Sequence, residues 1–189
     1  MEIRRRQLPH WYEPRQRYFI TIRCAGSLPQ EVIERYQALL EENPDPVQNY
    51  DFRESAFEVL EKYLDQGLGF APFISQEICE AMTEELRKIS NEDFPMVHWV
   101  VMPNHLHLLT DVLKFKTIQD FSNGLKRIKG RSGLRLNRLL KRQGAFWQRE
   151  WYDHWVRDDR GWEFYKKYIF QNPVKARLVG NSSDYPWIQ

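Results

Sequence analysis

Two histidines separated by one leucine, His105-Leu106-His107, have the clearest chemical potential in the sequence. In a β-strand, residues i and i+2 point to the same face, so the two imidazoles would lie side by side while the leucine faces the core. Neutral imidazoles are common metal ligands, and an adjacent pair makes half of a divalent-metal site. Histidines at a surface or core rim would give the same pattern, and a third ligand must come from elsewhere.

A second candidate pair, Tyr168 and Asn172, stands four residues apart near the end of the chain. On a helix this spacing places both side chains on one face, one turn apart. Tyrosine can act as a nucleophile, and an amide oxygen can bind a metal ion. Tyr165 lies on nearly the same face and Tyr152 is close in sequence, so spacing alone does not select the nucleophile. A packing role is the alternative for each tyrosine.

The elements that must position these residues follow from the pattern of apolar residues and turn formers. Residues 17–24 alternate as expected for a strand. Residues 97–101 are expected to form another, and residues 105–109, after the MPN turn, a second strand or its continuation. An aromatic strand is expected within residues 144–158. Helices are expected over residues 30–42, 52–66, 75–90, 117–142 and 160–170. Gly130 and Gly133 favour an interruption of the fourth helix, and Pro173 is expected to end the last one.

This order of elements predicts an α+β fold. The economical arrangement is a ferredoxin-like or RRM-like antiparallel sheet with helices on one face and a C-terminal helix that carries Tyr168. The length of 189 residues favours one domain over 1–189, with about 29–92 as an acidic helical insertion after the first strand.

Composition excludes several classes of protein. With 42% hydrophobic and 29% charged residues, the chain is neither disordered nor of low complexity. No apolar run approaches the roughly 18 residues that cross a bilayer, and the basic start lacks the apolar segment of a signal peptide. Cys24 and Cys79 follow no metal-binding spacing, so buried reduced thiols are expected. The expectation is a soluble cytoplasmic protein.

The net charge of +2 hides a strong division along the chain. Residues 31–92 carry 15 acidic and 5 basic side chains, whereas residues 111–150 carry 11 basic and 3 acidic ones. The first 30 residues are also basic. This asymmetry is typical of a surface that binds a polyanion, although a solvated helical face would explain the charge run equally well.

Several longer motifs occur together and in order: MPNHLHLL at 102–109, FWQREWYDHWVRD at 146–158 and YIFQNPVKARLV at 168–179. With the opening RRRQLPHWYEPRQRYFITIRC, they resemble the HUH single-tyrosine transposases, which are IS200-like. Within that family they are most similar to the REP-associated tyrosine transposase subgroup. Leu106 is the hydrophobic residue between the two histidines of the HUH motif.

The resemblance implies a metal-dependent single-stranded DNA endonuclease and strand transferase. His105 and His107 would bind Mg²⁺ or Mn²⁺, with Asn172 as the third ligand. Tyr168 would attack a scissile phosphate in a palindromic, REP-like hairpin and form a 5′-phosphotyrosine with a free 3′-OH. Such a covalent ester retains the energy needed for rejoining, so no nucleotide cofactor is required.

The same resemblance implies that basic residues contact the DNA hairpin, on the chromosome of a bacterium. No membrane partner is expected, and a monomer is favoured while a dimer stays open. The candidate DNA contacts are Arg4, Arg5, Arg6, Lys126, Arg127, Lys129, Arg131, Arg135 and Arg149.

Two other functions are compatible with these residues. A nucleic-acid-binding module without catalytic activity would keep the fold and the basic face, and its DNA binding would not depend on Tyr168 or metal. A phosphodiesterase that uses water would need the two histidines as ligands but would form no covalent adduct with DNA.

Overall fold

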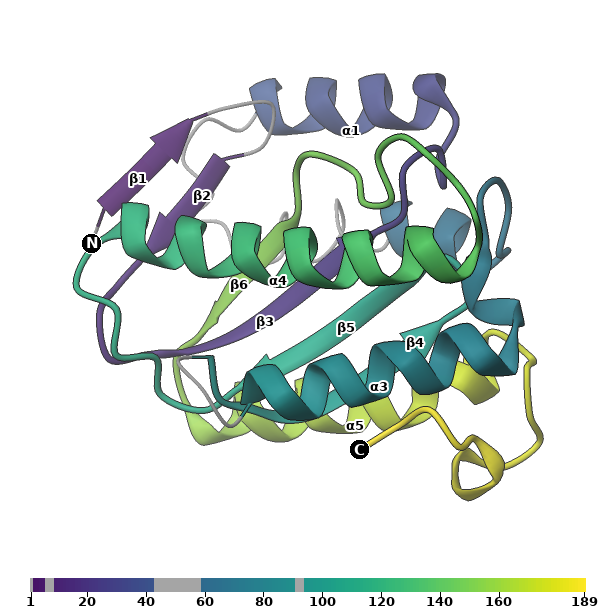
Figure 1. Cartoon of the computed structure of the whole chain (residues 1–189). Coiled ribbons are helices and arrows are strands. Elements are labelled where there is room, and N and C mark those ends of the chain that lie inside the picture. Colours follow the sequence, from purple (N-terminus) through teal and green to yellow (C-terminus); the bar gives the residue numbers. More distant parts are fainter. Residues whose placement is uncertain (1, 6–8, 43–58, 91–93) are drawn as a thin grey trace.

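A four-stranded antiparallel sheet forms the centre of the protein (Figure 1). The computed structural model describes residues 2–5, 9–42, 59–90 and 94–189. The strands are β3 (Arg17–Arg23), β4 (Met96–Met102), β5 (His105–Thr110) and β6 (Tyr152–Val156), arranged in the order β4-β5-β3-β6. The first strand of the sheet in the chain is thus paired with the third and the fourth, as in the predicted ferredoxin-like fold.

Alternation along β3 divides the core between the two faces of the sheet. Tyr18, Ile20 and Ile22 belong to one buried apolar cluster, whereas Phe19 belongs to a second cluster on the opposite face. Strand β5 alternates in the same way, because Leu106 and Leu108 join the first cluster. The two histidines of β5 therefore face the second cluster.

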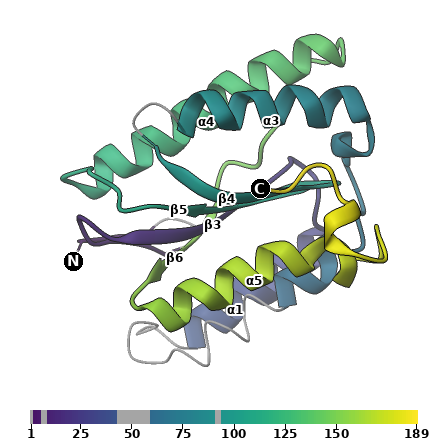
Figure 2. The same ribbon diagram turned by 90° about the horizontal axis from the view of Figure 1, so that it is seen from below.

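Helices cover both faces of the sheet (Figure 2). The sequence predicted helices on one face of the sheet; α3 (Gln76–Ser90) and α4 (Ile118–Leu139) lie on one face, whereas α5 (Asp159–Lys175) packs on the other. Helix α1 (Gln30–Glu42) lies on the side of α5. Among the described helices, none is both long and apolar enough to span a membrane.

The acidic insertion is described over α1 and from residue 59 onward, where residues 59–64 are helical. The expected helix over 52–66 therefore lies partly outside the described residues. Leu28, Val32, Leu60 and Leu64 form a small apolar cluster of their own. This cluster fixes residues 59–64 against α1 on the side of the sheet that carries the histidines.

Two expected breaks in helices are wrong. Helix α4 runs without interruption through Gly133, where an added Cβ would lie 3.3 Å from both Phe146 and Trp147, so this glycine allows close packing. Helix α5 continues past Pro173 to Lys175. A proline in the last turn removes only one backbone hydrogen bond, and burial of Pro173 offsets that loss.

An N-terminal hairpin of β1 (Glu2–Arg5) and β2 (Pro9–Tyr12) was not expected from the sequence pattern. His10 of β2 is buried and binds Asp153 of β6 and Glu150, which attaches the hairpin to the edge of the sheet. Cys24 and Cys79 are both free and buried thiols.

Candidate active site

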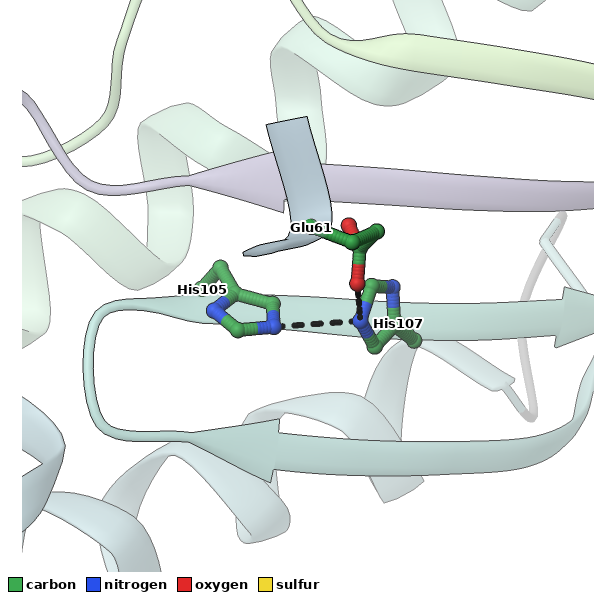
Figure 3. Close-up of side chains that lie close together, drawn as sticks. All are labelled: Glu61, His105 and His107. Atoms are coloured by element: carbon green, nitrogen blue, oxygen red, sulfur yellow. Dashed lines mark hydrogen bonds and ion pairs between the residues drawn. The ribbon is translucent and has the colours of Figure 1, made fainter. Parts of the chain in front are cut away.

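The two histidines of β5 converge on one point (Figure 3). Both side chains are fully buried, and the Nε2 atoms of His105 and His107 are 3.0 Å apart. His107 pairs with Thr21 of β3 on one side and with Val100 of β4 on the other. The strand spacing predicted from HxH therefore brings the two imidazoles together.

The tautomer of His105 follows from its neighbours. The backbone carbonyl of Leu68 can only accept, so the amide nitrogen of Asn104 donates to it at 3.0 Å. The amide oxygen of Asn104 then faces Nδ1 of His105 at 2.8 Å, which makes Nδ1 the protonated nitrogen. Burial, with the neighbouring His107, lowers the pKa of His105 to about 3. His105 is thus neutral and directs the Nε2 lone pair toward His107.

His107 is oriented from both sides of its ring. Its Nδ1 lies 2.9 Å from Oγ1 of Thr21, and its Nε2 lies 3.1 Å from a carboxylate oxygen of Glu61. The ring also stacks on Phe19 at 5.3 Å. Glu61, His105 and His107 each offer a ligand atom, and these atoms all lie within 4.8 Å of one another.

Glu61 comes from the acidic insertion and was not among the residues singled out in the sequence. Its side chain is 1% exposed, and the oxygen that faces His107 also accepts a hydrogen bond from Tyr168. Burial alone would raise the pKa of Glu61, but the positive potential of His107 and these hydrogen bonds lower it below the ordinary value. The other oxygen, Oε1, has no hydrogen-bond partner in the described part of the chain.

The tyrosines of α5 occupy different surroundings. The ring of Tyr168 lies edge-on to His107 at 5.4 Å, and its hydroxyl donates to Glu61. Burial and the negative charge of Glu61 raise the pKa of Tyr168 well above its ordinary range. Tyr165 instead stacks on Phe19 at 4.4 Å in the apolar cluster. Contact with the histidines thus singles out Tyr168.

Asn172 is fully buried one turn after Tyr168. Neither its Oδ1 nor its Nδ2 has a hydrogen-bond partner within the ranges that the structure covers, although the amide lowers the pKa of Tyr168. The ammonium group of Lys175 lies 3.9 Å from a carboxylate oxygen of Asp65. Burial and the negative charge of Glu61 raise the pKa of Asp65 to about 6. The buried, unsatisfied amide is compatible with the predicted role of Asn172 as a ligand.

The donor set fits a divalent cation. Two ligand atoms at right angles around an ion, each about 2.1 Å away, are about 3.0 Å apart. The observed separations of 3.0 Å between the imidazoles and 3.1 Å between His107 and Glu61 match this value. Two imidazole nitrogens with carboxylate or amide oxygens suit Mn²⁺, and the oxygens make Mg²⁺ acceptable.

The candidate DNA contacts lie elsewhere. Helix α4 covers the face of the sheet opposite the histidines, and Lys126, Arg127 and Arg131 are exposed on it. Lys129 donates to the backbone carbonyl of Arg149 at 2.6 Å, which joins α4 to the segment before β6.

Other members of that set have different surroundings. Arg135 forms ion pairs with Glu84 at 2.5 Å and Glu85 at 2.8 Å on α3. Arg4 and Arg5 belong to β1, and Arg6 lies outside the described residues. Arg23 of β3 is the register partner of His105 on the neighbouring strand, so its half-buried side chain lies on the face of the histidines. Burial lowers the pKa of Arg23 to about 10.

Comparisons with known proteins show which family the chain belongs to. The sequence model of the family described as "Transposase IS200 like" matches residues 71–172, which include His105, His107, Tyr168 and Asn172. A REP-associated tyrosine transposase of Escherichia coli K12 is 29% identical over 98 residues, covering 50% of this chain and 53% of the relative. A Haemophilus influenzae protein of the same designation is 27% identical over 103 residues, covering 50% and 57%.

The chain thus matches these curated relatives over about half their length. A solved structure of a REP-associated tyrosine transposase bound to a REP hairpin superposes with a TM-score of 0.56 at 20% identity. That match covers 100% of this chain and 82% of the other, so the two share a fold. Because the family match spans more than half of the sequence, the chain belongs to the IS200-like transposase family, as its motifs predicted.

Proposed function

We propose that this protein is a metal-dependent single-stranded DNA endonuclease and strand transferase that acts through a 5′-phosphotyrosine. One observation carries the proposal: the hydroxyl of Tyr168 and the Nε2 of His107 meet at one buried carboxylate, beside His105. Family membership supports the same chemistry. The site of action would be the chromosome, in the bacterial cytoplasm.

In this proposal, His105 and His107 hold a divalent cation, with Asn172 as the ligand expected from the family resemblance. When bound, the ion would polarise the phosphate oxygens and offset the charge that develops in the transition state. Asn104 and Thr21 contact the outer nitrogens of the two imidazoles and hold the rings in place.

The chemical step uses the hydroxyl oxygen of Tyr168. That oxygen attacks the phosphorus, the bond from phosphorus to the 3′ oxygen breaks, and the departing 3′ oxygen takes up a proton. Because the pKa of Tyr168 is raised, the phenol is protonated at neutral pH before the reaction. Its hydrogen bond to Glu61 holds the hydroxyl beside the two histidines, and the phenol proton leaves to water as the oxygen attacks. Attack by a 3′-OH on the phosphotyrosine reverses the step and reseals a strand.

A DNA hairpin is the proposed substrate, because a structure with this fold has been solved on a REP hairpin. Lys126 and Arg127 on α4 would supply salt-dependent phosphate contacts. Since α4 and Tyr168 are on opposite faces of the sheet, DNA that reaches both must pass around an edge. Arg23, beside His105, would then meet the phosphates near the site of cleavage.

The proposal can be tested by following strand cleavage. Purified protein with Mn²⁺ and single-stranded hairpins from repeats that flank its gene should give a DNA–protein band on a denaturing gel. Tyr168→Phe and chelation of the metal should each abolish the band, whereas Tyr165→Phe should keep it. Cleavage without a covalent band would favour the water-using phosphodiesterase, and hairpin binding without cleavage would favour the binding module.

A further inference from the structure

We propose that Glu61 is a further protein ligand of the divalent cation, beside His105, His107 and the predicted Asn172, so that the acidic insertion is part of the metal centre. The inference rests on the proposed function because it assumes that His105 and His107 bind the ion. It assigns a ligand outside residues 71–172, the part of the chain that matches the family.

The first argument concerns the protons at the point where the side chains meet. His105 carries its proton on Nδ1, so its Nε2 presents a lone pair. The Glu61 oxygen presents lone pairs as well, and it lies 3.1 Å from His107 Nε2. Without a cation, a single proton on Nε2 of His107 would have to donate to both Nε2 of His105 and the carboxylate oxygen of Glu61. A cation between the three atoms satisfies all three lone pairs together.

The second argument concerns the burial of charge. A carboxylate with 1% exposure costs several kcal/mol of desolvation unless positive charge or hydrogen bonds compensate it. Tyr168 donates to one oxygen of Glu61, while Oε1 has no hydrogen-bond partner among the described residues. His107 and Tyr168 already stabilise the charge on one oxygen of Glu61, and a divalent cation at the carboxylate would stabilise it further.

The third argument concerns the preference of the ion. Mg²⁺ and Mn²⁺ favour oxygen ligands, and the HUH pair contributes only nitrogen. The carboxylate of Glu61 adds a charged oxygen, with the same separation from His107 as neighbouring ligands around a six-coordinate ion.

The insertion reaches the histidines at a second point. The carbonyl of Leu68 orients Asn104, which fixes the tautomer of His105. Gly69 holds this loop close, because an added Cβ would lie 2.1 Å from the carbonyl oxygen of Gly26. The insertion thus supplies one proposed ligand and positions another.

The test measures Mn²⁺ affinity by calorimetry on the whole chain without DNA. His107→Ala defines binding at this site. Glu61→Gln removes the charge at nearly constant shape, and we expect it to weaken binding about tenfold or more, since even outer-shell changes cost about 10–100-fold. Glu77→Gln, the same substitution at an exposed glutamate of α3, is the matched control and should leave the affinity unaltered.

The outcomes separate this inference from the proposed function. Unchanged Mn²⁺ affinity in Glu61→Gln, with loss in His107→Ala, overturns the role of Glu61 and leaves the function intact. Loss in Asn172→Ala but not in Glu61→Gln assigns the third ligand to Asn172. Loss in Glu61→Gln without any DNA adduct in the wild type supports the inference and removes the function. If Glu61→Gln does not fold, Glu61→Asp decides, because its shorter carboxylate should weaken binding while a purely structural role would leave it unchanged.

Discussion

At the scale of single residues, Asn104 holds the proposed metal ligand His105 in one tautomer. Its amide is fixed by the carbonyl of Leu68 and in turn fixes the proton of His105. Without Asn104, Nδ1 and Nε2 of His105 could exchange the proton, and the bare nitrogen would no longer always face His107.

Asn104→Ala should therefore weaken Mn²⁺ binding by about 10–100-fold without removing a proposed ligand, because outer-shell partners set ring orientation and basicity. Calorimetry measures the change. Asn123→Ala, an exposed asparagine on α4, is the control and should leave the affinity unaltered. Equal affinity in both variants would contradict the assigned role of Asn104.

The proposed phosphate contact of Arg23 can be tested separately from metal binding. If Arg23 contacts phosphate, Arg23→Gln should lower the rate of adduct formation about tenfold or more, because a charged donor to the reacting group is lost. Mn²⁺ affinity should stay within about twofold of wild type. A drop in metal affinity equal to the drop in rate would show that Arg23 acts on the structure of the site.

The sequence could predict only the part of the site that follows a regular spacing. His105 with His107, and Tyr168 with Asn172, are placed together by the strand and helix repeats. Glu61 belongs to an acidic segment of the sequence, and glutamates are usually exposed. Its neighbours Leu60 and Leu64 mark the buried side of that segment, but no local pattern indicates which element covers it.

At the scale of elements, a buried ionic group attaches the N-terminal hairpin to the sheet. His10 stacks on Trp151 at 4.5 Å and binds both Asp153 and Glu150. Burial lowers the pKa of His10, but the two carboxylates outweigh it and raise the pKa from 6.5 to about 9. His10 is therefore protonated in the folded protein at neutral pH.

A group whose pKa is higher in the folded than in the unfolded state stabilises the protein at pH values below its unfolded pKa. This stabilisation disappears as the pH rises through the folded pKa. Protonated His10 should therefore add about 3 kcal/mol to the free energy of unfolding below about pH 6.5, and this contribution should be lost as the pH rises from about 6.5 to about 9. Urea unfolding at several pH values should show the difference between wild type and His10→Gln shrinking over this window. A difference that does not vary with pH would contradict the ionic attachment.

The elements themselves were largely predictable because alternation and helical periodicity are local. The errors arose where packing decided the outcome. Gly133 lies inside α4 because Phe146 and Trp147 pack against its bare backbone, and Pro173 is tolerated in the final turn of α5. The hairpin of β1 and β2 depends on partners more than 100 residues away.

At the scale of the whole molecule, the sheet separates two groups of residues with different proposed roles. The histidines, Glu61 and Tyr168 lie on the side of α5, and the exposed basic residues of α4 lie on the other (Figure 2). A hairpin held on α4 would have to send a single strand around the sheet to Tyr168.

This separation predicts that DNA affinity and metal affinity respond to different substitutions. Lys126→Ala and Arg127→Ala should each reduce the slope of hairpin affinity against salt by about one, and leave Mn²⁺ binding unaltered. Arg135→Ala should instead lower the free energy of unfolding by less than about 1 kcal/mol, because Arg135 joins α4 to α3. Fluorescence anisotropy at several salt concentrations measures the slope, and a slope changed only by Arg135→Ala would contradict the assignment.

The central claim is that Tyr168 is the nucleophile. The most direct measurement is peptide mapping of the trapped adduct: protein incubated with Mn²⁺ and hairpin DNA is digested with protease and nuclease, and the modified peptide is identified by mass spectrometry. The account predicts a nucleotide joined through phosphate to Tyr168. A nucleotide on Tyr165 or Tyr152 would contradict it, as would cleaved DNA with no modified tyrosine.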